Sequence, residues 1–236
     1  MEAKKNQWKT LRHYTSVGWL KTILKNNRIK FSDACSKDIE NRWDDHNDIF
    51  ALRHYRQCYG KNPLVLCFTH SISIHHWEYY GKSWPENSSE EDKTKCCIVF
   101  DYKKIEALIE QKKRQGMDLN MTPVTYYSLK QLKNVTIDKE QLPFVKKYGF
   151  NVDKEERLVL LVENKGRDYF LTDIVDCIAS ITLYVKQGVP NYEGQINKIK
   201  ADLVQLCPVL HKHIGMSALC DSKGWQAALK KSITLK

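Results

Sequence analysis

The chain has 236 residues, 42% of them hydrophobic, and its net charge is +10. This length and composition predict one folded domain over residues 1–236 and exclude a disordered chain. No apolar run approaches the roughly 18 residues of a membrane-spanning helix, and no apolar stretch typical of a signal peptide follows the basic N-terminus. We therefore expect a cytoplasmic protein that contacts no membrane.

The positive charge is concentrated at both termini. Residues 1–30 hold eight Lys or Arg against one Glu, and residues 186–236 hold eight Lys against three acidic side chains, whereas residues 31–60 are net acidic. Basic surfaces attract nucleic acid or an acidic protein, although solubility explains such a charge equally well. Binding to nucleic acid should weaken as salt rises.

The first expected element is a helix that follows the capping residue Ser16. Its apolar residues share one helical face: Val17, Leu20, Ile23 and Leu24. Residues 29–32 alternate like a half-buried strand, and the charged residues 38–57 indicate a surface helix or a structured loop. The apolar run at residues 64–69 predicts a buried strand.

An exposed loop is expected over residues 82–95, followed by a strand at residues 96–100. Asp101 can cap the next helix, which ends near Gly116. Residues 124–127 predict another strand.

In the last third, residues 139–148 suggest a helix, and residues 157–162 and 181–185 are apolar strands. A helix follows with Ile196, Ile199, Leu203 and Leu206 on its apolar face, and residues 225–229 suggest a short helix. The six or seven short strands favour an α+β fold with a mixed, split sheet and flanking helices over a doubly wound sheet.

The eight cysteines do not indicate disulfides or a metal site. They are scattered through apolar stretches, and no Cys-x-x-Cys occurs. In a cytosolic protein such thiols are expected to be reduced and buried.

Three short segments carry side chains suited to ligand binding: residues 12–15 (Arg-His-Tyr-Thr), 77–80 (Trp-Glu-Tyr-Tyr) and 155–157 (Glu-Glu-Arg). In order and spacing they resemble the family called domain of unknown function 2971, whose pattern runs HYT, W..Y and E.R. The order His, Tyr, Glu also resembles that of NAD-using ADP-ribosyltransferases. This second resemblance implies an ADP-ribosyltransferase-like fold.

The resemblance implies NAD as the substrate, with no metal, and a role for each matching residue. Glu155 would be the catalytic carboxylate, which binds the nicotinamide ribose and opposes positive charge as nicotinamide leaves. His13 would contact the adenosine ribose, Arg12 a phosphate, and Tyr80 the nicotinamide ring. The full set of implied NAD-binding residues is Arg12, His13, Tyr14, Thr15, Trp77 and Tyr80.

Each of these residues also has a plainer interpretation. His13 could cap or pack against the core, and the aromatic pair Trp77 and Tyr80 could belong to the core. Glu155 could form an ion pair at the rim with Arg157 or Lys154. Because side chains alternate along a strand, only one of Glu155 and Glu156 can face a cleft.

The activity that the resemblance implies is transfer of ADP-ribose to nucleic acid or protein by a toxin or phage-defence effector. One alternative is a non-catalytic module on the same fold that binds nucleic acid or protein. Another is a metal-independent ribonuclease that uses His13, a Tyr and a Lys. The chain departs from the first family at residues 36–41, where the family has an Asn-Asp-Pro segment.

Overall fold

The computed structural model describes residues 10–33, 46–72, 76–77, 94–163, 167–184 and 191–217. The chain divides into two compact units. The first is Met1–His13, Asn27–Ile72 and Phe100–Cys177; the second is Tyr14–Asn26, Ser73–Val99 and Ile178–Lys236. Whether the chain folds as one domain stays a prediction.

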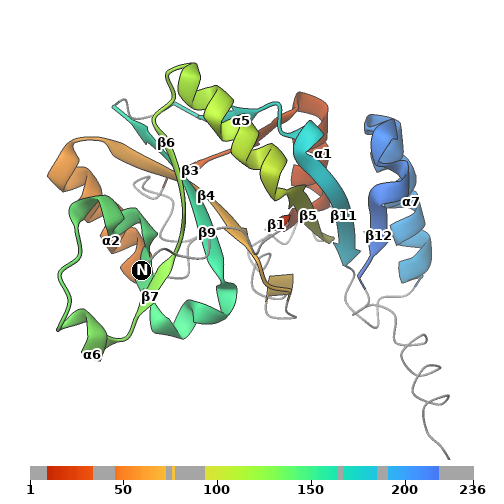
Figure 1. The fold of residues 1–236 in the computed structure, drawn as a ribbon. Helices are drawn as coiled ribbons and strands as arrows, with labels where there is room; N and C mark the ends of the chain where they lie inside the picture. Colours follow the sequence, from red (N-terminus) through yellow and green to blue (C-terminus); the bar gives the residue numbers. More distant parts are fainter. Residues whose placement is uncertain are drawn as a thin grey trace, which may run out of the picture. The chain divides into compact units, whose positions relative to one another are not determined.

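The first unit is built on the antiparallel strands β4 (Asn62–Thr69), β9 (Glu155–Val162) and β6 (Leu119–Pro123), with β9 between the other two (Figure 1). The short strand β3 (Ser32–Asp33) pairs with the first half of β4. Strand β1 (Thr10–Ser16) meets β4 where Arg12 lies opposite Thr69.

Two smaller strand pairs and several helices complete the first unit. Strand β2 (Arg28–Lys30) pairs antiparallel with β10 (Phe170–Thr172), and β7 (Thr125–Tyr127) pairs parallel with β8 (Val145–Lys147). The α-helices are α2 (His46–Tyr59), α5 (Tyr102–Arg114) and α6 (Leu129–Leu132). Shorter 3-10 helices cover Lys139–Phe144, Tyr148–Asp153 and Val175–Cys177.

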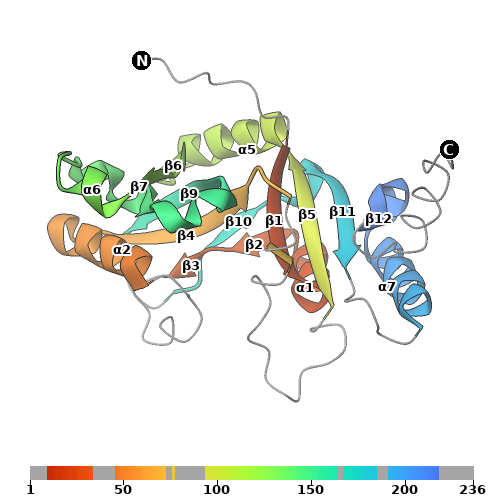
Figure 2. The same cartoon turned by 90° about the horizontal axis from the view of Figure 1, so that it is seen from below.

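In the second unit β11 (Ile178–Tyr184) pairs parallel with β12 (Ile214–Met216), and the strand order is β12-β11-β5-β1. Residues of β5 (Lys95–Asp101) and of β1 belong to both units. The helices are α1 (Val17–Asn26), α7 (Tyr192–Leu206), which lies beside β12 in Figure 2, and the 3-10 helix Pro208–His213.

Helix α1 forms where the sequence predicts it. Ser16 Oγ accepts a hydrogen bond from the backbone N–H of Trp19 at 3.2 Å, which satisfies one of the free donors at the helix start. The predicted apolar face is buried: Val17, Leu20, Ile23 and Leu24. Helix α5 begins in the same way, because Asp101 accepts from the N–H of Lys104 at 3.1 Å.

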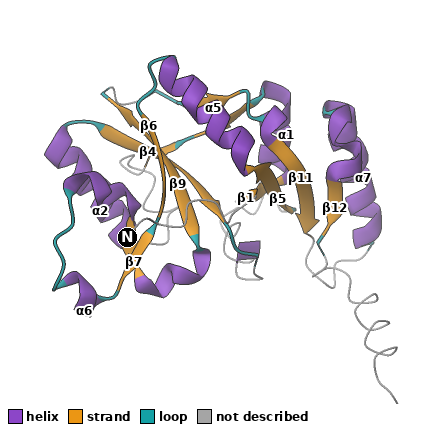
Figure 3. Cartoon of the chain, viewed as in Figure 1, coloured by secondary structure: helices purple, strands orange, loops and turns teal. Residues whose placement is uncertain are grey.

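The predicted fold class, α+β with a mixed sheet and flanking helices, is confirmed (Figure 3). The predicted helix over residues 139–148 is wrong in its second half. Pro143 interrupts the segment because it lacks an N–H donor, and the chain then enters β8. Strands β1, β6, β10 and β12 were not predicted. Of the loop expected over residues 82–95, residues 82–93 lie outside the described residues and Lys95 begins β5, and the helix expected at residues 225–229 also lies outside the described residues.

None of the helices in the described ranges is long and apolar enough to cross a bilayer. In those ranges, no three His, Cys, Asp or Glu side chains are grouped so that they could hold a metal ion. The described cysteines are free thiols: Cys58, Cys67, Cys96, Cys97, Cys177 and Cys207.

Candidate functional site

The strand register in the first unit places Glu155 and Arg12 on the same face. Arg12 lies opposite Thr69 on β4, and Thr69 lies opposite Glu155 on β9. Directly opposite residues of antiparallel strands point to the same side. The Cα atoms of Arg12 and Glu155 are therefore two strand spacings apart, about 10 Å.

The next residue along each strand points to the other face. Phe68 lies opposite Glu156, and its ring meets the imidazole of His13 edge-on, with 6.3 Å between ring centroids. His13 therefore shares a face with Glu156, and Arg12 shares the opposite face with Glu155. The two adjacent glutamates thus point to opposite faces of β9, and which of them faces a cleft stays a prediction.

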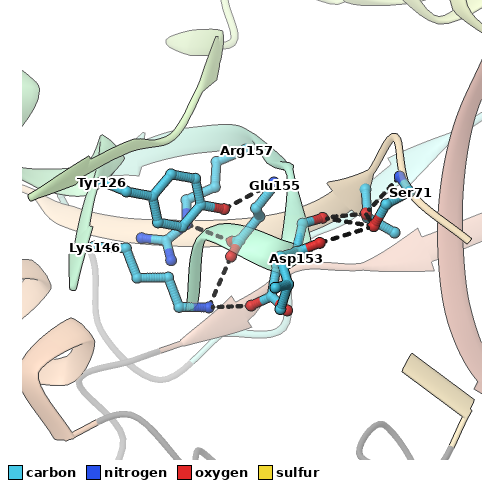
Figure 4. A network of polar contacts seen from close by, with 8 residues as sticks. Ser71, Tyr126, Lys146, Asp153, Glu155 and Arg157 are labelled. Carbon is cyan, nitrogen blue, oxygen red and sulfur yellow. Dashed lines mark hydrogen bonds and ion pairs between the residues drawn. The ribbon is translucent and has the colours of Figure 1, made fainter. Parts of the chain in front are cut away.

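Glu155 lies in a buried network of ion pairs (Figure 4). Its Oε1 accepts from Arg157 Nε at 2.6 Å, and its Oε2 accepts from Lys146 Nζ at 2.9 Å. Lys146 also bonds Asp153 Oδ2 at 3.1 Å, and Arg157 donates a second hydrogen bond to the carbonyl of Pro143 at 2.8 Å. The network holds two cations and two anions, so its formal charge balances.

The small β7–β8 pair supplies two of the groups around Glu155. Tyr126 on β7 lies beside Lys146 on β8. The hydroxyl oxygen of Tyr126 accepts from the backbone N–H of Glu155 at 2.9 Å. Glu155 follows Lys154, whose left-handed φ of 44° turns the chain from the 3-10 helix into β9. The side chain of Glu155 is thus held by Lys146 and Arg157, and its backbone N–H is held by Tyr126.

The carboxyl of Glu155 stays ionised despite its burial. Burial alone would raise its pKa, but the positive charges of Arg157 and Lys146 outweigh burial and lower the pKa to about 2. Coulomb attraction over such short distances is strong where water is excluded. A fixed negative charge is therefore held at the start of β9 throughout the physiological pH range.

Glu156 has a different environment on the opposite face. Its Oε2 lies 2.6 Å from His70 Nε2, and its Oε1 accepts from the hydroxyl of Tyr102 at 3.1 Å. His70 Nδ1 lies 3.3 Å from the carbonyl oxygen of Thr10. The carbonyl can only accept, so Nδ1 carries a proton.

His13 is a neutral imidazole with a defined tautomer. Its Nδ1 lies 3.0 Å from the carbonyl oxygen of Cys67, which can only accept, so Nδ1 donates. Burial lowers the pKa of His13, against the smaller opposing effect of the bond to Cys67. Nε2 is therefore an acceptor, and it would receive a hydrogen bond from a ligand hydroxyl rather than donate one.

The other predicted NAD-binding residues belong to the second unit. Tyr14 and Trp77 are buried in one cluster. The Tyr14 ring stacks on the His76 ring with 5.2 Å between ring centroids, and the Trp77 indole stacks on the Tyr184 ring with 5.0 Å between centroids. Tyr14 also meets the Trp77 ring edge-on at 4.8 Å. Each of the two rings therefore already stacks on a neighbour.

The structure assigns Arg12, His13 and Glu155 to one unit, and Tyr14, Thr15 and Trp77 to the other. Thr15 is half-buried on β1. Tyr80 lies outside the described residues, so its role as a stacking residue stays a prediction.

The sequence reasoning missed three members of the site: Lys146, Asp153 and Tyr126. An ion pair of Glu155 with Arg157 or Lys154 at the rim was one interpretation of the sequence, and the pair with Arg157 forms. It is instead fully buried, with Arg157 0% exposed. The Val-Lys-Lys sequence of β8 carried no signal that Lys146 faces the interior.

No family model and no curated protein matches the chain, so no matching model supports the resemblance to domain of unknown function 2971. Solved structures of DarT from Thermus sp. 2.9 are similar in chain trace. The complex with ADP-ribosylated ssDNA is 10% identical, with a TM-score of 0.41, and the match covers 92% of this chain and 98% of that chain.

The complex of the same protein with NAD+ is 9% identical, with a TM-score of 0.38, and the match covers 89% of this chain and 96% of that chain. Its complex with carba-NAD+ is 11% identical, with a TM-score of 0.37. At these scores the likeness assigns no function to the residues described above.

Proposed function

We propose that the chain is a cytoplasmic, NAD-dependent ADP-ribosyltransferase that modifies nucleic acid or protein and acts as a toxin or defence effector. The observation that carries the proposal is the row Arg12–Thr69–Glu155 on one face of three neighbouring strands. The row combines a guanidinium with a carboxylate that stays ionised. The guanidinium suits the pyrophosphate of a dinucleotide, and the carboxylate suits the ribose from which nicotinamide leaves.

The residues present fit NAD by their chemistry. Arg12 donates one hydrogen bond to the carbonyl of His70 at 3.2 Å, and its planar fork has further N–H groups that suit a pyrophosphate. Each oxygen of the Glu155 carboxylate has about two acceptor positions, of which a cation takes one. The Cys67 thiol donates to this carboxylate as well, which leaves about one acceptor position for a ribose hydroxyl.

In this proposal NAD supplies the ADP-ribose group and nicotinamide leaves. Glu155 holds the hydroxyl of the nicotinamide ribose and opposes the positive charge that develops on that ribose. Arg12 holds the pyrophosphate and fixes the position of the ribose relative to Glu155. His13 is proposed to bind NAD as a hydrogen-bond acceptor, and Tyr14, Thr15, Trp77 and Tyr80 remain proposed contacts.

The test is release of nicotinamide from NAD in the presence of single-stranded DNA, RNA or a cytosolic protein extract. Mass spectrometry then locates ADP-ribose on the acceptor. We expect turnover by the native chain. Glu155→Gln, compared at equal concentration of folded protein as judged by circular dichroism, should reduce it by about 100-fold or more, because an electrostatic contact of the transition state is lost. The matched controls are Glu156→Gln, on the opposite face, and the exposed Glu110→Gln.

The outcomes separate the alternatives. Loss of turnover in Glu156→Gln, with normal turnover in Glu155→Gln, would transfer the catalytic role to Glu156. No nicotinamide release with any acceptor would end the transferase proposal. Salt-dependent binding of nucleic acid without turnover would then favour a binding module, and cleavage of RNA without NAD would favour a ribonuclease.

A further inference from the structure

Lys146 is a buried lysine whose position has no explanation in the packing of β8 alone. Its side chain is 6% exposed and lies between two carboxylates, at 2.9 Å from Glu155 Oε2 and 3.1 Å from Asp153 Oδ2. The ammonium also lies 4.9 Å from the ring centroid of Phe150. Burying an ammonium costs several kcal/mol unless it is paired, so this position depends on its anions.

Lys146 and Arg157 each bind a different oxygen of the Glu155 carboxylate. Arg157 Nε holds Oε1 at 2.6 Å, and Lys146 Nζ holds Oε2 at 2.9 Å. A carboxylate held at one oxygen can rotate about its last bond, whereas one held at both oxygens cannot. The two cations therefore fix the plane of the carboxylate as well as its charge (Figure 4).

Arg157 and Lys146 differ in what their removal would do. Arg157 is 0% exposed and also bonds the carbonyl of Pro143, so it ties β9 to the 3-10 helix Lys139–Phe144. Lys146 can instead be removed together with Asp153, which takes one charge of each sign from the network. This makes Lys146 the cation whose effect on Glu155 can be measured in a folded protein.

We propose that Lys146 is a positioning residue for Glu155: from β8 it holds the second carboxylate oxygen in the orientation that the transferase reaction needs. This inference rests on the proposed function for its catalytic part. Lys146 itself does not touch NAD in this scheme. Its loss should lower kcat and leave KM for NAD unchanged, because binding through Arg12 is untouched.

The experiment compares Lys146→Met and the charge-balanced double variant Lys146→Met/Asp153→Asn with the native chain. The control is Lys61→Met, which breaks the exposed pair of Lys61 with Asp118. The first readout is the pH titration of the Glu155 carboxyl by carbon NMR in glutamate-labelled protein, assigned with Glu155→Gln. We expect the midpoint to rise by about one pKa unit or more in Lys146→Met, and in the same direction in the double variant.

The second readout is the rate of nicotinamide release. We expect kcat to fall about tenfold or more in both variants and in neither case a change in KM, whereas Lys61→Met keeps native values. A folded double variant with the native titration midpoint, or with the native kcat, would overturn the inference. If the native chain turns over no NAD, the proposed function fails, and the carboxyl titration alone still decides whether Lys146 governs Glu155.

Discussion

Glu155 and Glu156 are adjacent, both are buried, and they are held in different ways on opposite faces of β9. Their residues are 4% and 2% exposed, so burial does not distinguish them. Glu155 contacts two side chains with fixed positive charge, Arg157 and Lys146. Glu156 contacts the imidazole of His70 and the hydroxyl of Tyr102.

The difference shows that the partners of a buried carboxyl decide its chemistry. Arginine and lysine require an anion between them, so the negative charge of Glu155 is obligatory. Glu156 instead contacts an imidazole and a phenol, which carry no fixed charge of the kind that arginine and lysine carry. A reaction that depends on permanent negative charge is therefore better served by Glu155.

The largest effect should follow from Arg157→Met. Removing one partner of a buried ion pair leaves the other charge uncompensated, and we expect the free energy of unfolding to fall by about 3–5 kcal/mol. Urea denaturation followed by circular dichroism measures this loss. The matched control, Lys113→Met, breaks the exposed pair with Glu110 and should leave the midpoint unchanged.

A second variant keeps the test decisive if Arg157→Met does not fold. Arg157→Met/Glu155→Gln removes one charge of each sign, so it should recover most of the stability lost in Arg157→Met. A loss of less than about 1 kcal/mol in Arg157→Met would show that the network contributes no more than an ordinary hydrogen bond.

A smaller effect is expected for Glu156→Gln. The amide oxygen of glutamine can still accept from Tyr102 or His70, so only part of the contact is lost, and we expect a decrease of about 1–2 kcal/mol in the free energy of unfolding. The same urea experiment measures it. A decrease as large as that of Arg157→Met would mean that Glu156, too, depends on its negative charge, and the contrast between the two faces would fail.

The sequence predicted the elements whose signals are local. Helices α1 and α5 begin at a capping residue followed by apolar residues at helical spacing, and both form as expected. Strands β10 and β12 have three residues each, and they exist because distant segments pair with them. Such pairing leaves little trace in a short sequence window.

For the candidate site, too, the sequence indicated the local contact and missed the contacts made by distant segments. A rim ion pair with Arg157 or Lys154 was the plainer interpretation of Glu155, and the structure shows the pair with Arg157, buried instead of at the rim. Lys146 and Asp153 join it because the 3-10 helix between them folds back toward β9, and the register of β7 with β8 sets the direction of the lysine. Nothing in a Val-Lys-Lys sequence distinguishes such a lysine from a solvated one.

The smallest expected effect concerns His13, which shares a face with Glu156. Burial lowers the pKa of His13 below its usual value of 6.5, so the unfolded chain binds this proton more readily than the folded chain. The contribution of His13 to stability is therefore complete above about pH 6.5 and is lost as the pH falls toward its folded pKa.

His13→Asn, whose amide can still donate to the Cys67 carbonyl, should flatten this loss in urea denaturation between about pH 7 and pH 5. The exposed His211→Asn is the matched control and should keep the native slope. A native slope in His13→Asn would mean that His13 binds its proton equally well in the folded and the unfolded chain, and burial would then not lower its pKa.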